Sequence, residues 1–144
     1  MSAGAVAEPT PLTPARILVA CDDPAQRAVT CRTLEQAGYT TCSAADGAQA
    51  WQALLAAPAA LVLLERRLPD VDGRDLCRRI KREAALAGTF VVIAVDQPAD
   101  PAETAPGGAG EADGCIGLPI SDRQLQSSIA AFLRIRDLAV ALRA

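Results

Sequence analysis

The sequence contains no histidine and very few aromatic residues. These absences limit the metal sites that the chain can form and the kinds of side chain that can fill its core. Aromatic side chains make up 3% of the chain although 51% of its residues are hydrophobic, so the core must be aliphatic and rich in alanine. Without histidine, and without a Cys-x-x-Cys pair, a zinc site is not expected. We interpret the five scattered cysteines as small apolar residues in a reducing cytoplasm: Cys21, Cys31, Cys42, Cys77 and Cys115.

Long hydrophobic runs and an excess of positive charge are also absent. No segment approaches the ~20 apolar residues that a membrane span requires, and the first residues lack the features of a signal peptide. The net charge of −3 and the pI near 4.9 argue against nucleic-acid binding, which usually needs a basic face. We therefore expect a cytoplasmic protein with neither a membrane nor a nucleic acid as a partner.

Short apolar runs alternate along the chain with stretches of helical spacing. The expected strands cover residues 16–21, 39–44, 60–64, 90–95 and 115–118, and the expected helices begin near Pro24, Gly47, Asp72 and Ser121. Nearly continuous apolar strands that alternate with helices predict an α/β fold with helices on both faces of a parallel sheet. We expect a doubly wound five-stranded sheet in the flavodoxin-like order 2-1-3-4-5, with its site where strands one and three end.

The helical spacing also predicts which side chains face the sheet. Three sets of residues recur at that spacing, one in each of the first three helices: Ala28, Cys31, Leu34 and Ala37; Trp51, Leu54 and Leu55; and Leu76, Cys77 and Ile80. We expect these sets to be buried.

The 144 residues are enough for one domain with a proper core. Residues 1–15 are rich in proline and read as a disordered tail, 16–136 as the folded domain, and 137–144 as an extension of the last helix. The stretch from Asp96 to Gly114, where a fourth helix belongs, holds several prolines and glycines. Because these residues break helices, we expect that helix to be degraded.

Four motifs together carry a family resemblance. They are Ile-Leu-Val-x-x-Asp-Asp ending at Asp23, Ala45-Asp46-Gly47, Leu-Pro-x-x-Asp-Gly over residues 68–73, and Pro119 after the last strand. In this order they resemble the receiver domain of response regulators, of the CheY-like superfamily, over about Ala15 to Arg136. The resemblance implies the flavodoxin-like receiver fold and a role in bacterial two-component phosphorelay signalling.

The resemblance also assigns roles to single positions, and most of them are substituted. Asp22 and Asp23 match the acid pair that holds Mg²⁺, whereas Glu65 stands at the phosphoacceptor aspartate. The remaining switch positions are a hydroxyl residue, an aromatic residue and a lysine, and here they carry Val95, Cys115 and Leu118. Glu65 reaches further than aspartate by one methylene, and a misplacement of about 1 Å can lower a rate ~100-fold. We therefore expect an atypical pseudo-receiver that is not phosphorylated in the usual way.

Weak Mg²⁺ binding stays open, with Asp22, Asp23, Glu65 and the backbone carbonyl of Arg67 as ligands, although no cofactor is required. We expect a stand-alone, non-enzymatic interaction module whose partner is a histidine kinase, an output protein or a regulatory protein. Two alternatives remain: a functional phosphoreceiver that uses Glu65 with Mg²⁺, and a flavodoxin-like enzyme or cofactor binder.

Two surfaces could serve such an interaction. The third helix carries five basic residues, which form either a solvated face or a patch for an acidic partner: Arg74, Arg78, Arg79, Lys81 and Arg82. The last helix, from Asp122 to Arg143, would span about 33 Å. Its apolar residues at coiled-coil spacing predict a seam for a homodimer or a partner helix, with a frayed tail as the alternative: Phe132, Ile135, Ala139 and Leu142.

Overall fold

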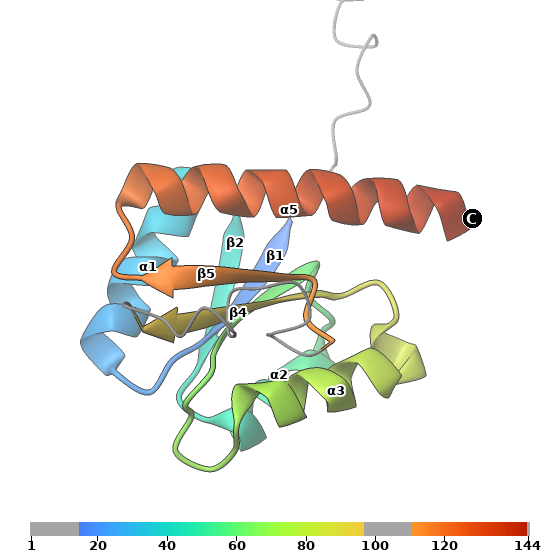
Figure 1. Ribbon diagram of the computed structural model, residues 1–144, viewed down its shortest axis with the longest axis horizontal. Coiled ribbons are helices and arrows are strands. Elements are labelled where there is room, and N and C mark those ends of the chain that lie inside the picture. Colours follow the sequence, from blue (N-terminus) through green and yellow to red (C-terminus); the bar gives the residue numbers. More distant parts are fainter. Residues whose placement is uncertain (1–14, 97–110, 144) are drawn as a thin grey trace, which may run out of the picture.

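A five-stranded parallel sheet forms the centre of the molecule, and helices cover both of its faces (Figure 1). The computed structural model describes residues 15–96 and 111–143. Its strands are β1 (Arg16–Ala20), β2 (Thr40–Ala44), β3 (Leu61–Glu65), β4 (Phe90–Asp96) and β5 (Gly114–Leu118). The helices are α1 (Pro24–Gln36), α2 (Gly47–Ala56), α3 (Gly73–Arg82), the short 3-10 turn η2 (Ala84–Leu86) and α5 (Asp122–Arg143).

The strand order is β2-β1-β3-β4-β5, which confirms the predicted doubly wound topology. All neighbouring strands run parallel. β3 continues one residue further than the sequence predicts, because Glu65 still pairs with Ala94 of β4. Glu65 therefore belongs to the last position of a strand, not to the loop after it.

Aspartate side chains start three of the helices, as their sequence positions predict. Asp23 accepts a hydrogen bond from the backbone N–H of Ala25 (2.9 Å). Asp46 accepts one from the backbone N–H of Gln49 (2.8 Å). Asp72 caps α3 through the backbone N–H of Arg74 (2.9 Å). Each carboxylate pairs one of the N–H groups that a helix start leaves free, so local sequence fixes where these helices begin.

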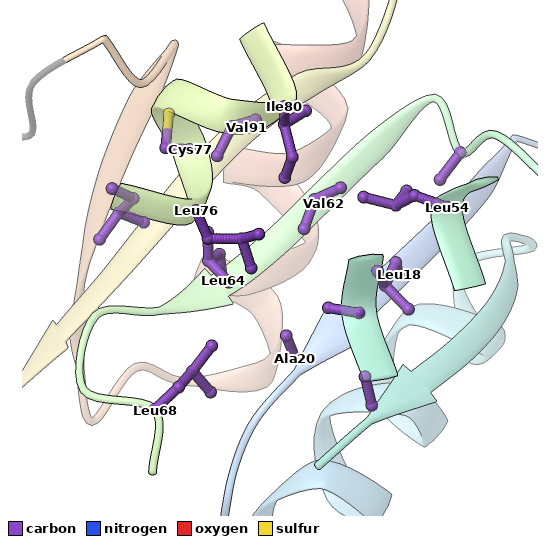
Figure 2. Packing of buried hydrophobic residues seen from close by; sticks show 14 of the residues in the cluster. Leu18, Ala20, Leu54, Val62, Leu64, Leu68, Leu76, Cys77, Ile80 and Val91 are labelled. Carbon is purple, nitrogen blue, oxygen red and sulfur yellow. The ribbon is translucent and has the colours of Figure 1, made fainter. Parts of the chain in front are cut away.

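Two apolar clusters hold the helices on the sheet. The first lies under α2 and α3, and Figure 2 shows its side chains, with Leu18, Val62 and Leu64 of the strands facing Leu54, Leu76 and Ile80 of these helices. The second lies under α1 and α5 and is built around Leu34, Ile129 and the opposite set of strand residues, such as Ile17 and Leu63. Because both faces of β1, β3 and β4 are covered, their side chains are almost all buried.

Some predicted helix faces are wrong. Of the four residues predicted to be buried near α1, only Leu34 is, whereas Ala28 is exposed because it lies about 120° from Leu34 around the helix axis. Ala37 is exposed because it is the cap that follows the end of α1. On α2, Leu54 is buried but the neighbouring Leu55 points to solvent. The face predicted for α3 is confirmed.

Two predictions fall on residues outside the described part of the chain. They are the disordered tail, at residues 1–14, and most of the broken fourth helix, at residues 97–110. The extended last helix is confirmed, since α5 continues to Arg143 and its final turns pass beyond the strands in Figure 1. Within 15–96 and 111–143, no helix is both long enough and apolar enough to cross a lipid bilayer.

Gly73 is needed where the loop after β3 turns into α3. A Cβ atom there would lie 2.7 Å from the backbone oxygen of Glu65 and 3.0 Å from the Cα of Arg66. Both are backbone atoms that cannot rotate away. We expect Gly73→Ala to lower the free energy of unfolding by about 1–3 kcal/mol, measured by urea denaturation.

Gly88→Ala is the matched control. A Cβ at Gly88 would make only ordinary contacts, at 3.5 Å from Arg136 and 3.7 Å from Val140. Equal losses for the two variants would contradict the argument from close approach.

Candidate functional site

The carboxyl edge of the sheet brings together strand ends that are far apart in the sequence. Successive side chains of a strand point to opposite faces of the sheet. The position of a residue along its strand therefore decides which pair of helices its side chain faces. Cys21, Glu65, Ala94 and Leu118 face the α1 and α5 side, where they line one cavity. Val95 faces the opposite side, in the cluster under α2 and α3.

The Glu65 carboxylate is bound by a thiol. The Sγ–H of Cys21 donates to Glu65 Oε2 at 3.5 Å and to the backbone oxygen of Asp23 at 3.6 Å. Burial, and after it the negative charge of Glu65, raises the pKa of Cys21 to about 11. The thiol therefore stays protonated at neutral pH and acts as a hydrogen-bond donor, not as a nucleophile.

The two aspartates after β1 do not converge on Glu65. Asp22 is exposed, and the carboxylate of Asp23 is used to cap α1. Arg27 of α1 places its Nη1 on the backbone oxygens of Cys21 (2.6 Å) and Asp22 (3.4 Å), which brings a cation to this edge.

Mg²⁺ needs several oxygen ligands at about 2.1 Å from one point. In the described ranges, no group of three or more histidine, cysteine or acidic residues lies close enough to hold a metal ion. Arg67, whose carbonyl was the fourth expected ligand, pairs through its backbone with Asp72 across the loop. As arranged here, the predicted donor set does not fit Mg²⁺.

The three residues predicted to stand at substituted switch positions lie in apolar surroundings. Val95 is 4% exposed, and Cys115 is half-buried against the same cluster. Leu118 is half-buried against the opposite cluster, beside Glu65 in the cavity lining. Valine and leucine offer neither a hydroxyl nor a cation, so these two strand ends give a phosphoryl group no side-chain partner.

The loop that follows Glu65 is tied to a distant helix by Asp70. Its two carboxylate oxygens accept hydrogen bonds from the backbone N–H groups of Gly47 (2.8 Å) and Ala48 (3.0 Å) at the start of α2. These bonds hold the pKa of Asp70 below its ordinary value, with the Gly47 bond the largest cause. Sequence reasoning missed this contact because nothing local in residues 68–73 points to α2.

The same loop is held from the other side by Asp72. Burial raises the pKa of the Asp72 carboxyl group. The hydrogen bonds from Arg74 and its positive charge outweigh that effect, so the pKa of Asp72 is lowered overall. The backbone N–H of Gly73 also donates to the oxygen of Arg66 (2.6 Å). Glu65 is thus followed by a loop with several fixed anchors.

Most basic residues of α3 already have acidic neighbours. Arg74 pairs with Asp72, Arg78 with Asp75, Lys81 with Asp113 (2.8 Å) and Arg82 with Glu111 (3.4 Å), while Arg79 stacks on Trp51 at 3.9 Å. This pairing favours the solvated face over a patch for an acidic partner.

The predicted seam of α5 is only partly exposed. Ile135 and Leu142 point to solvent, with exposed fractions of 54% and 87%, and Ala139 is half-buried. Phe132 instead packs against Gly114 of β5. The sequence analysis did not include Leu138, which is 67% exposed and completes a stripe with Ile135 and Leu142. We call these three residues the α5 stripe.

Comparison with known proteins shows which family this chain resembles. The chain matches the model of the response regulator receiver domain over residues 17–130. It is 36% identical over 118 residues to the transcriptional regulatory protein GltR of Pseudomonas aeruginosa, covering 82% of this chain and 48% of GltR. It is 31% identical over 124 residues to the DNA-binding dual master transcriptional regulator RpaA of Synechocystis, covering 85% of this chain and 50% of RpaA.

Solved structures agree on the fold. A response regulator receiver domain protein from Methanospirillum hungatei superimposes with a TM-score of 0.77 at 25% identity, covering 88% of this chain and 99% of that one. The chemotaxis response regulator CheY4 of Vibrio cholerae has a TM-score of 0.76 at 22% identity, covering 83% and 99%. The second likeness shows the fold alone.

The chain therefore belongs to the response regulator receiver domain family. Domains of this family are in general signalling modules of two-component systems, not enzymes, and they interact with histidine kinases and output domains. The chain spans about half the length of the curated relatives that it matches. The expected lack of a nucleic-acid partner has no support, because RpaA is by name a DNA-binding regulator.

The Asp70 contact predicts an acid-dependent part of the stability. Because the folded-state pKa of Asp70 is depressed, its contribution is present above the ordinary value of 3.8 and is lost as the pH falls through the folded-state pKa. Asp70→Asn should lower the free energy of unfolding at pH 7 by up to about 1 kcal/mol, since this carboxylate is largely exposed.

The difference between Asp70→Asn and the wild type should shrink as the pH falls below 3.8. Urea denaturation over a pH series measures it. Asp137→Asn, an exposed change of the same charge near the end of α5, is the control. A difference that stays constant across that range would rule out the carboxylate as its cause.

Proposed function

We propose that this chain is a degenerate receiver domain that works as a protein-interaction module in two-component signalling and is not phosphorylated in the usual way. The observation that carries the proposal is the pairing of the Glu65 carboxylate with the Cys21 thiol, beside strand ends that supply only Val95 and Leu118.

Phosphoryl transfer depends on the position of the attacking oxygen and on groups that stabilise the developing charge. Glu65 carries its carboxylate one methylene further than aspartate would. Removing one charge-stabilising group typically costs about 2.7–4 kcal/mol of transition-state stabilisation. Two such groups are replaced here, by Val95 and Leu118, so the expected rate falls by several powers of ten.

The α5 stripe supports the interaction half of the proposal. Its spacing of three and then four residues is that of one face of a paired helix. Large apolar side chains that are exposed together mark contact surfaces more often than scattered ones do. We propose that the stripe packs on a partner helix, with a second copy of the chain as the simplest partner.

Phosphorylation can be tested directly. The wild-type protein is incubated with acetyl phosphate and Mg²⁺, and its intact mass is measured over time. We expect no stable mass gain of one phosphoryl group, because Glu65 is displaced and Val95 and Leu118 cannot stabilise the transferring group.

A variant that restores the family residues is the positive control. The triple change Glu65→Asp, Val95→Thr and Leu118→Lys restores the shorter acid, the hydroxyl and the cation, and it should take up more phosphoryl than the wild type under the same conditions. A stable phosphoryl group on residue 65 of the wild type would overturn the proposal in favour of a working phosphoreceiver.

Self-association is tested by Leu138→Ser, which changes the α5 stripe at an exposed position. We expect the dimerisation constant to weaken about tenfold or more, because each dimer loses two apolar contacts. Sedimentation velocity over a concentration series measures this constant.

Leu55→Ser is the matched control, since Leu55 is also an exposed leucine on a helix. Deleting the end of α5 would be less clean, because the Nε of Arg136 donates to the backbone oxygen of Gly88 at 2.9 Å. If Leu55→Ser weakens association as much as Leu138→Ser, the stripe is not the contact surface.

A further inference from the structure

A cavity of about 150 Å³ opens beside Glu65, between α1, the sheet and the start of α5. Its wall is mainly apolar and is formed by side chains from four strands or their ends and from the first turns of α5: Val19, Leu63, Ala94, Leu118, Ile120 and Leu125. Val29 of α1 also lines it and is 50% exposed, which places this side chain at the rim.

The size of the cavity sets the size of what it can hold. An apolar cavity of about 150 Å³ in another protein binds benzene, a molecule of six carbon atoms. A saturated ring or chain of about six carbons therefore fits here. The apolar wall would gain free energy by removing such a hydrocarbon from water.

The charged residues of the cavity indicate which functional group a bound hydrocarbon should carry. Glu65 and Asp122 both line it. Among the residues that the structure describes, no arginine or lysine forms an ion pair with Glu65, whose recorded hydrogen-bond donor is the neutral Cys21 thiol. A carboxylate next to an apolar wall is stabilised most by a cation that also donates hydrogen bonds.

Other ligand chemistries fit less well. An anion would be repelled by Glu65 and Asp122. A neutral hydrocarbon would fill the space but would leave the half-buried carboxylate with only a thiol donor. No arginine or lysine is among the residues that line the cavity, and Arg27, near the same edge, places its Nη1 on the backbone oxygens of Cys21 and Asp22.

We propose that this cavity binds a small alkylammonium ion, with its hydrocarbon part against the apolar wall and its ammonium group on the Glu65 carboxylate. The site goes beyond the proposed interaction role, because it uses Glu65 as a binding group and does not depend on what α5 contacts. A ligand here touches α1, the ends of the central strands and the first turns of α5 at once.

The test is a titration of the full chain, labelled at its methyl groups, with cyclohexylammonium chloride at constant ionic strength and neutral pH. We expect saturable NMR shifts confined to methyl groups of the cavity wall, such as those of Val19, Leu63 and Leu125. Cyclohexanol has the same ring without the charge and should bind at least about tenfold more weakly.

Two substitutions probe the two halves of the site. Glu65→Gln keeps the shape but removes the charge, and it should weaken cyclohexylammonium binding about tenfold or more while leaving cyclohexanol binding unchanged. Asp137→Asn is the charge-matched control and should have no effect. Val29→Trp should block the rim and abolish binding of both compounds, whereas Leu55→Trp, on α2, should not.

Several results would overturn the proposal. They are shifts that never saturate or that spread outside the cavity, equal affinity for the charged and neutral rings, or unchanged binding in Glu65→Gln. If Glu65→Gln fails to fold, the comparison of Val29→Trp with Leu55→Trp decides the location, and the two rings decide the role of charge. The phosphorylation test uses a different readout, so either proposal can fail without the other.

Discussion

In a β-strand successive side chains point to opposite faces, and at the carboxyl edge of this sheet that alternation decides which groups can meet. Because both faces are covered by helices, a shift of one residue would exchange every buried set. Cys21, Glu65 and Leu118 share the α1 side, whereas Val95 faces α2 and α3. The positions that the sequence predicts as switch positions thus lie on two sides of the sheet, and their side chains do not form one polar centre.

The acidic side chains at this edge of the sheet form hydrogen bonds that stabilise the fold. Asp23 and Asp72 cap helices, and Asp70 holds the loop after β3 against α2. These contacts hold the strand ends and the loop in place. The Glu65 carboxylate accepts its hydrogen bond from a neutral thiol, that of Cys21. The receiver scaffold is therefore held together at this edge by hydrogen bonds that need no phosphoryl group.

The sequence predicted most of the fold because the signals for it are local. Apolar runs mark the strands, and aspartates before Pro24, Gly47 and Gly73 mark where helices start. The predicted buried faces failed at Ala28 and Leu55, because apolar residues of small or medium size also occur on exposed helix faces and spacing alone cannot rank them.

The residue types at these positions are a property of the sequence by itself: Glu65 is the last residue of the third strand, Val95 the last but one of the fourth, and Leu118 the last of the fifth. Only the tertiary structure decided what those residues touch. The Cys21–Glu65 contact, the Asp70 bonds to α2 and the cavity beside Leu118 all join segments that are distant in the chain. No local pattern encodes such contacts, because they depend on the strand order and on the face to which each strand end turns its side chain.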